Sequence, residues 1–233
     1  MTTTFTGFRP EALAFLVELA LNNDRSWFQP RKSDYEALLK APLERLCMAL
    51  DEELRARGIP LAADPARSPF RIYRDVRFSR DKSPYKTNVG AGFPWTGEGG
   101  GVGGYFHLEP GASFVGGGMW HPEPARLAAW REAIIAARER VHAALEDPGF
   151  RATYGDVYGD RLKRAPAGFS PDDPDVDLLK LKDVIFRAAL SEEDVLAPDL
   201  PDRLADALAK AVPVLRLLAG LPGLAPPEGH LRD

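Results

Sequence analysis

Apolar residues recur at helical spacing in the N-terminal part of the chain, which predicts helices there. A first helix is expected at residues 10–21 and a second from residue 33 or 34 to about residue 40. Pro42 suits the first turn of a third helix, because proline lacks the N–H that a first turn leaves unpaired. The inner face of this third helix places Cys47 among leucines. The N-terminal part is therefore predicted to be helical and amphipathic.

The apolar period changes to two in the middle of the chain, which predicts strands. Short links rich in glycine separate these segments, and short links join antiparallel neighbours, whereas parallel strands need a long crossover. The pattern predicts an antiparallel meander of about four strands within residues 68–120. The strands are expected at residues 70–78, 87–93, 103–109 and 113–119.

Helical spacing returns after the meander. Pro213 is expected to kink or end the last helix, and residues 164–174 are expected to form a loop. The sequence thus predicts an α+β fold, a single domain over residues 1–224 with helices from both ends of the chain packed on the sheet, and a loose tail at residues 225–233. The C-terminal helices are expected at residues 124–145, 177–186 and 201–218.

Composition excludes several classes of protein. The chain has 233 residues, of which 45% are hydrophobic and 27% charged, which is typical of globular proteins and not of disordered, collagen-like or disulfide-scaffold chains. We find no apolar run of the roughly 20 residues that cross a bilayer, and the N-terminus lacks the pattern of a signal peptide. The lone Cys47 cannot form an internal disulfide. A cytoplasmic protein without a membrane partner is expected.

Positive charge gathers in one short segment. The formal net charge is −4, yet residues 67–86 hold seven lysines and arginines and two aspartates. A protein that binds nucleic acid by neutralising phosphates is usually basic over a whole domain, so this composition argues against nucleic acid as the partner. The segment instead indicates a local site.

Arg74 is the most informative residue of this segment, because strand alternation places it on the apolar face of residues 70–78. A guanidinium keeps its proton, so a covered one needs a compensating partner. Three interpretations remain open. The partners are carboxylates such as Asp75 and Asp81 in a structural ion-pair network, or a small bound phosphate or carboxylate, or, as a third alternative, nucleic acid.

The anion-binding hypothesis assigns roles to particular residues. Arginines would bind the anion as forks, lysines as point charges, an aspartate would orient them, and a tyrosine hydroxyl would add a hydrogen bond. His107 is a candidate proton carrier, whereas no histidine pair has the spacing of a metal site. The residues alone leave open whether the site is enzymatic, which cofactor it uses and how the chain assembles. The ligand-binding candidates are Arg71, Arg74, Asp75, Arg77, Lys82, Tyr85 and Lys86.

The run FRIYRDVRFSRDKSPYKT at residues 70–87 closely resembles the signature of a bacterial and fungal family known as domain of unknown function 2461. Other segments resemble blocks of the same family in the same order, so the resemblance covers nearly the whole chain. It implies an α+β domain of this length and no particular reaction, cofactor or catalytic residue. These other segments are Asn22-Asn23 with Trp27-Phe28, residues 105–108, residues 118–120, residues 162–169 and Leu181-Lys182.

Overall fold

Four strands and a series of helices make up the residues that the computed structural model describes, 4–77 and 79–222. The N-terminal elements are α1 (Pro10–Leu21), α2 (Arg25–Phe28), the 3-10 helix η1 (Gln29–Arg31), α3 (Lys32–Tyr35), the π-helix η2 (Glu36–Lys40) and α4 (Ala41–Ala56). The strands are β1 (Val89–Pro94), β2 (Gly103–Leu108), β3 (Phe114–Met119) and β4 (Val184–Ala189). The other helices are α5 (Pro124–Ala136), α6 (Arg138–Leu145), α7 (Pro148–Tyr154), α8 (Val176–Leu179), α9 (Glu192–Leu196) and α10 (Leu200–Ala219).

The strands form one antiparallel sheet in the order β1-β2-β3-β4, which confirms the α+β class. The register fixes which residues share a face, because directly opposed residues of paired strands point to the same side. Tyr105 of β2 lies opposite Gly92 of β1 and Gly116 of β3, and Gly116 lies opposite Arg187 of β4. These four residues therefore form one row across the sheet.

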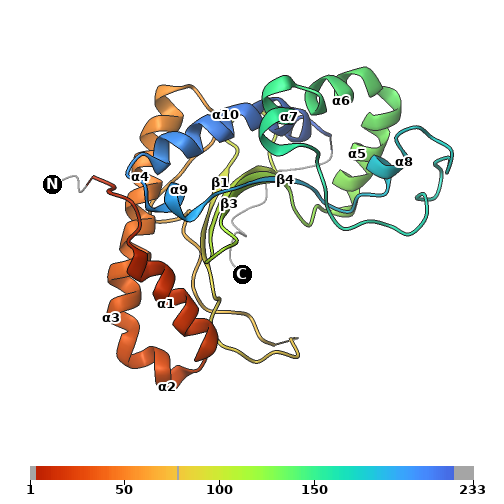
Figure 1. The fold of residues 1–233 in the computed structure, drawn as a ribbon. Helices are drawn as coiled ribbons and strands as arrows, with labels where there is room; N and C mark the ends of the chain where they lie inside the picture. Colours follow the sequence, from red (N-terminus) through yellow and green to blue (C-terminus); the bar gives the residue numbers. More distant parts are fainter. Residues whose placement is uncertain (1–3, 78, 223–233) are drawn as a thin grey trace.

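The two faces of the sheet differ in burial. Phe106 and Phe186 point into the core, on the side of the sheet that α10 crosses (Figure 1). A Cβ at Gly104 would lie 2.8 Å from the Leu208 side chain of α10, so the glycine permits this close approach. On the opposite face the glycines Gly90, Gly92 and Gly116 are buried, whereas the strand residues that carry side chains are half-buried or exposed, as at Tyr105. We call this second side the open face.

The N-terminal helices confirm the predicted periodicity. The first predicted helix is α1, with the predicted bounds, and Cys47 is fully buried on the inner face of α4. The second and third predicted helices join through η2, in which the N–H of Ala41 donates to the carbonyl of Glu36, five residues back. Pro42 follows directly and has no N–H to continue the ordinary pattern, which explains this local widening of the helix.

The prediction that residues 70–78 form a strand of the sheet was wrong. This segment is extended but makes only isolated bridges, Pro69 with Ala91 and Tyr73 with Tyr85. Pro84 lies opposite Arg74 and accepts its N–H at 2.9 Å, but proline has no N–H to return the second bond of an antiparallel pair, so the ladder ends there. Phe78, the last residue of the predicted strand, lies outside the described residues.

The predicted helix at residues 177–186 was also wrong, and the fourth strand comes from this region. Only α8 is helical there, and the chain then enters β4 through Val184, Ile185 and Phe186. β-Branched and aromatic residues favour a pleated surface, and β3 offers its free edge as the partner.

Three other expectations concern the C-terminal half. The predicted helix at residues 124–145 is divided into α5 and α6 at Ala137, whose φ of −136° is not helical. The helix α10 continues through Pro213 instead of ending there, and the stretch at residues 164–174 is a loop as predicted. The predicted tail at residues 225–233 lies outside the described residues.

Candidate functional site

The charged motif folds back on itself beside the N-terminal helices. The N–H of Arg74 donates to Pro84 O at 2.9 Å, and the N–H of Lys86 donates to Ile72 O at 2.7 Å. Arg74 and Lys86 thus lie on opposite strands of one short hairpin-like segment, although twelve residues separate them in the sequence. The turn that contains Asp81 reverses the chain and places Arg74 and Lys86 in the same hairpin-like segment.

Tyr85 anchors this segment in the core. Its side chain is 1% exposed, and its ring stacks on Phe28 with the ring centroids 4.1 Å apart. Asn23, in the loop after α1, forms two hydrogen bonds with the Tyr85 backbone. Its Nδ2 donates to the Tyr85 carbonyl at 3.0 Å, and its Oδ1 accepts the Tyr85 N–H at 3.1 Å. The backbone of Tyr85 is therefore fixed, and with it the neighbouring Lys86.

Arg74 is compensated by a carboxylate of its own segment. Its guanidinium forms an ion pair with Asp81, while Asp81 also accepts the hydroxyl of Ser83 at 2.6 Å and its N–H at 2.9 Å. The Arg74 hydrogen bond and then those from Ser83 hold the pKa of Asp81 well below its usual range. The Arg74 side chain is 31% exposed, so it is less covered than strand alternation predicted.

Three other candidates, Asp75, Arg77 and Lys82, make contacts within the same segment and do not line the cavity described below. Asp75 accepts the Nε–H of Arg77 at 3.0 Å, and this hydrogen bond is the main cause that lowers the pKa of Asp75 to about 2. Lys82 Nζ donates to the carbonyl of Val76 at 2.8 Å. These contacts hold the outer part of the segment together.

Lys86 has a different environment. Its ammonium lies 5.6 Å from the centroid of the Phe70 ring, and the side chain is half-buried. Burial and then the nearby charge of Arg71 lower the pKa of Lys86. Within residues 4–77 and 79–222, no carboxylate forms an ion pair with Lys86. A desolvated cation beside a second cation is electrostatically unfavourable unless an anion compensates it.

An open hollow of about 420 Å³ lies between this segment and the end of α1. It brings together three of the predicted ligand-binding residues, Arg74, Tyr85 and Lys86, whereas Arg71, Asp75, Arg77 and Lys82 do not line it. We call it the Arg74–Lys86 hollow. Its lining consists of Ala20, Asn23, Arg74, Asp81, Ser83, Tyr85, Lys86, Thr87 and Asn88.

His107 lies outside this hollow, on the open face of the sheet. Its Nδ1 is 3.1 Å from the hydroxyl of Tyr105, and its Nε2 is 2.9 Å from Oε2 of Glu109. Burial, together with the charge of Glu109, raises the pKa of Tyr105 to about 12. His107 therefore connects a neutral phenol in β2 to the carboxyl group of Glu109, just beyond the end of this strand.

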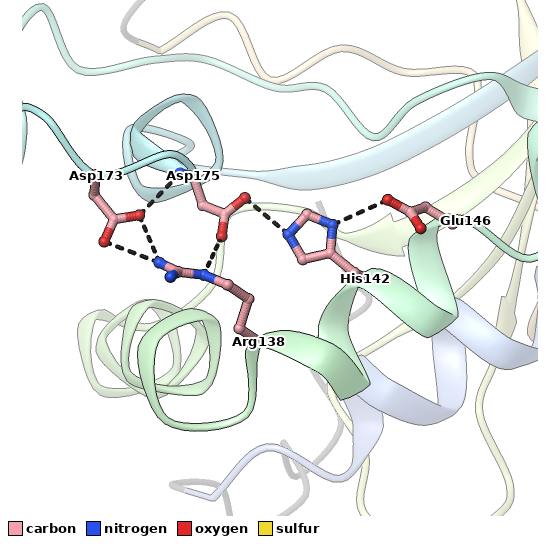
Figure 2. Close-up of polar contacts among 5 residues, drawn as sticks. All are labelled: Arg138, His142, Glu146, Asp173 and Asp175. Atoms are coloured by element: carbon pink, nitrogen blue, oxygen red, sulfur yellow. Dashed lines mark hydrogen bonds and ion pairs between the residues drawn. The ribbon is translucent and has the colours of Figure 1, made fainter.

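A second polar cluster was not predicted (Figure 2). Arg138 and His142 of α6 reach the loop before α8, where Nε of Arg138 binds Asp175 at 2.6 Å and Nη2 binds Asp173 at 2.8 Å. His142 lies between Glu146 at 3.1 Å and Asp175 at 2.9 Å, and hydrogen bonds to Glu146 and then to Asp175 raise its pKa. The helical spacing of His142 and Glu146 was a visible signal, but the aspartates come from a loop that no local pattern could place.

The sequence also missed the most buried cation of the described residues. Arg126 of α5 is 1% exposed, and its Nη2 donates to the carbonyls of Gly100 and, at 2.6 Å, Leu218. Its Nε has no hydrogen-bond partner, and burial lowers its pKa. Arg126 binds the last turn of α10 to a glycine loop, so its environment indicates a structural role.

Two kinds of feature are absent from residues 4–77 and 79–222. This part of the chain contains no group of three or more histidine, cysteine, aspartate or glutamate side chains arranged to hold a metal ion. No helix in it combines the length and the apolar composition that crossing a membrane requires.

Comparison with known proteins identifies a family. The model of DUF2461, described as a conserved hypothetical protein, matches residues 11–216, which include most of α1, the charged motif, the whole sheet and most of α10. The curated proteins gave no match, and neither did the solved structures. Because the family model covers most of the chain, the protein belongs to the DUF2461 family.

Proposed function

We propose that this protein binds a small molecule carrying a phosphate or carboxylate group in the Arg74–Lys86 hollow. One observation carries the proposal: the half-buried ammonium of Lys86 lies beside the charge of Arg71, and no carboxylate of the described residues pairs with it. A charge removed from water costs free energy unless an opposite charge or hydrogen bonds compensate it. A bound anion in the hollow would supply that compensation.

Arg74 can contribute to the same anion. Its pair with Asp81 uses Nη1, and a guanidinium has five N–H donors, so further donors remain for a ligand. Asp81 also fixes the orientation of the guanidinium, which reduces the entropy lost on binding. Phosphate and carboxylate are the groups that such a planar fork recognises.

A structural role is the second candidate, and a specific observation favours it. Arg74 pairs with Asp81 and Arg77 pairs with Asp75, which is what an ion-pair network predicts. The two candidates differ at Lys86, because a structural network has no need of a half-buried cation without a carboxylate. Lys86 is therefore the residue to test.

The experiment is a thermal melt with increasing inorganic phosphate at constant ionic strength. At a phosphate concentration ten times the dissociation constant, binding stabilises the folded state by about 1.4 kcal/mol. For a domain of this size, that corresponds to a rise in Tm of about 3 to 6 °C. Lys86→Met should abolish the rise. Lys82→Met removes an equal charge from the same motif outside the hollow and should keep it.

The outcome separates the two candidates. A rise that Lys86→Met removes and Lys82→Met leaves intact supports the anion site. Absence of any phosphate effect, or an equal response in the two variants, refutes it and leaves the structural network.

A further inference from the structure

Tyr105, His107 and Glu109 stand on the same side of one chain segment, because successive alternate residues of a strand share a face. The Tyr105 hydroxyl is 3.1 Å from His107 Nδ1, and His107 Nε2 is 2.9 Å from Glu109. Their contacts form one continuous line from phenol to imidazole to carboxylate. We call these three residues the Tyr105 triad.

The chemistry of the three groups fixes the direction of the hydrogen bonds. A carboxylate only accepts, so Nε2 of a neutral His107 carries the proton that faces Glu109. Nδ1 is then the acceptor of the neutral ring, and the Tyr105 hydroxyl donates to it. The triad is thus arranged to take a proton from Tyr105 and to stabilise the imidazolium that results.

Neighbouring residues hold the triad in place. The ring of Phe114 stacks on His107 with centroids 4.7 Å apart, and Ser113 exchanges hydrogen bonds with the backbone of Glu109 at 2.9 and 3.1 Å. At Gly90 a Cβ would lie 2.5 Å from the Tyr105 hydroxyl oxygen, so only glycine leaves room for the hydroxyl. The His107 ring, the space for the Tyr105 hydroxyl and the Glu109 backbone are therefore supported from outside the triad.

A single aromatic ring connects the triad to the Arg74–Lys86 hollow. Phe70 carries the Lys86 ammonium over its face at 5.6 Å, and its ring centroid is 5.9 Å from that of Tyr105. At the other side of the triad, the exposed Arg187 lies 5.5 Å over the ring of Phe114. A molecule with its anionic group at Lys86 would reach Tyr105 by extending along the Phe70 ring.

We propose that Tyr105 is a catalytic acid–base residue, with His107 as its proton acceptor and Glu109 as the positioning residue, acting on a hydroxyl-bearing phosphate or carboxylate molecule. The position of the anionic group rests on the proposed function, whereas the triad does not. In the step, the ligand hydroxyl gives its proton to the phenolic oxygen while the phenolic proton passes to His107 Nδ1. The ligand oxygen gains a negative charge, and the imidazolium is paired with Glu109.

The test measures the reactivity of Tyr105 with two sulfonyl fluorides, neutral benzenesulfonyl fluoride and anionic 4-(fluorosulfonyl)benzoate. The phenolic oxygen forms a bond to sulfur, the sulfur–fluorine bond breaks, fluoride leaves, and the phenolic proton goes to His107. Mass spectrometry of peptides gives the rate at each tyrosine. Tyr73 and Tyr158 are internal controls because they are 47% and 38% exposed and have no hydrogen bond to an imidazole among the described contacts.

The labelling rate that we expect for Tyr105 is higher than the rate that burial alone would give. Burial raises the pKa of Tyr105 to about 12, so without a base it should react more slowly than the exposed tyrosines. We expect it to react at least about tenfold faster, and His107→Asn to lower its rate by about 100-fold, the lower range of general-base catalysis. Glu109→Gln keeps the size of the side chain and should lower the rate by a smaller factor. Circular dichroism shows whether each variant is folded, and the rates at Tyr73 and Tyr158 show that the probe is equally reactive in each sample.

Lys86→Met separates the two proposals. If both hold, 4-(fluorosulfonyl)benzoate labels Tyr105 faster than the neutral probe, and Lys86→Met removes this advantage without changing the neutral rate. No advantage in the native protein refutes the anion site and leaves the triad standing. A Tyr105 rate no higher than those of Tyr73 and Tyr158, or one that His107→Asn leaves unchanged, overturns the triad.

Discussion

Replacing Arg126 with methionine should destabilise the protein more than any surface change to the charged motif. The guanidinium is 1% exposed and donates to the carbonyls of Gly100 and Leu218. Leu218 lies in the last turn of α10, where its carbonyl also accepts the N–H of Leu221 at 3.3 Å. Methionine fills much of the same volume but cannot donate, so both carbonyls would lose this donor.

The expected loss of unfolding free energy in Arg126→Met follows from two opposing effects. Each hydrogen bond from a charged donor contributes about 1.5 to 3 kcal/mol, and a buried acceptor without a partner costs about 1 to 3 kcal/mol. Burial lowers the pKa of Arg126, which means that desolvation disfavours the cation, and removing it recovers part of this loss. We expect a net decrease in unfolding free energy of about 2 to 4 kcal/mol, or roughly 5 to 15 °C in Tm.

The assay is urea unfolding of the native protein, Arg126→Met and Arg131→Met. Arg131 is the matched control because it lies on the same helix, is only half-buried and makes one such bond, from Nε to Leu179 O at 3.0 Å. Arg131→Met should cost less than half as much. If Arg126→Met lost less than about 1 kcal/mol, or no more than Arg131→Met, the carbonyls would not depend on Arg126 and the argument would fail.

Three further predictions concern titration and reactivity. The raised pKa of His142 means that its contacts with Glu146 and Asp175 stabilise the fold fully below the unfolded pKa of about 6.5 and lose this effect as pH rises through the folded value. Urea unfolding at acidic and at alkaline pH should show this loss, and a His142→Gln variant with the same pH dependence would contradict it. Burial raises the pKa of Cys47 to about 12, so Ellman's reagent should label it only after unfolding, and rapid labelling of the native protein would refute this. Arg77 lowers the pKa of Asp75 to about 2, so this pair stabilises above the unfolded pKa of about 3.9 and is lost as pH falls through 2; a carboxyl NMR titration with its midpoint near 4 would disprove it.

Local patterns were sufficient for the elements whose partners are close in sequence. The helix α1 follows from the spacing of its apolar residues, and β1, β2 and β3 follow from alternation and from the glycine links between them. Consecutive antiparallel strands need only short links, so the order of these three strands was predictable.

The fourth strand shows where prediction from local sequence patterns failed. β4 pairs with β3 across 64 intervening residues, from Met119 to Val184, and its own apolar run is short enough to fit a helix or a strand. The free edge of β3 decides between them, and no local pattern reports that edge. The charged segment before β1 failed for the opposite reason, because its alternation was regular but Pro84 could not complete the hydrogen-bond ladder.

The candidate site was predictable in part. The hollow contains Arg74, proposed from strand alternation, and Lys86, proposed from charge, but Asn23 was named only within a block of the family resemblance. Its role depends on the Tyr85 backbone, 62 residues away. The link from His107 to Tyr105 and Glu109 needed only strand alternation, which the sequence supplied.

The requirement that a covered guanidinium must have a partner was correct, but the sequence analysis assigned the covered position to Arg74 and not to Arg126. Arg74 keeps 31% of its side chain exposed and pairs with Asp81 at the surface, where solvent screens the interaction. Arg126 is covered completely and is held by carbonyls. Arg74→Met should therefore lower Tm by less than a third of the decrease that Arg126→Met causes, measured in the same buffer without phosphate. An equal or larger decrease at Arg74 would mean that the Asp81 pair is a main support of the fold, and the argument from solvent screening would fail.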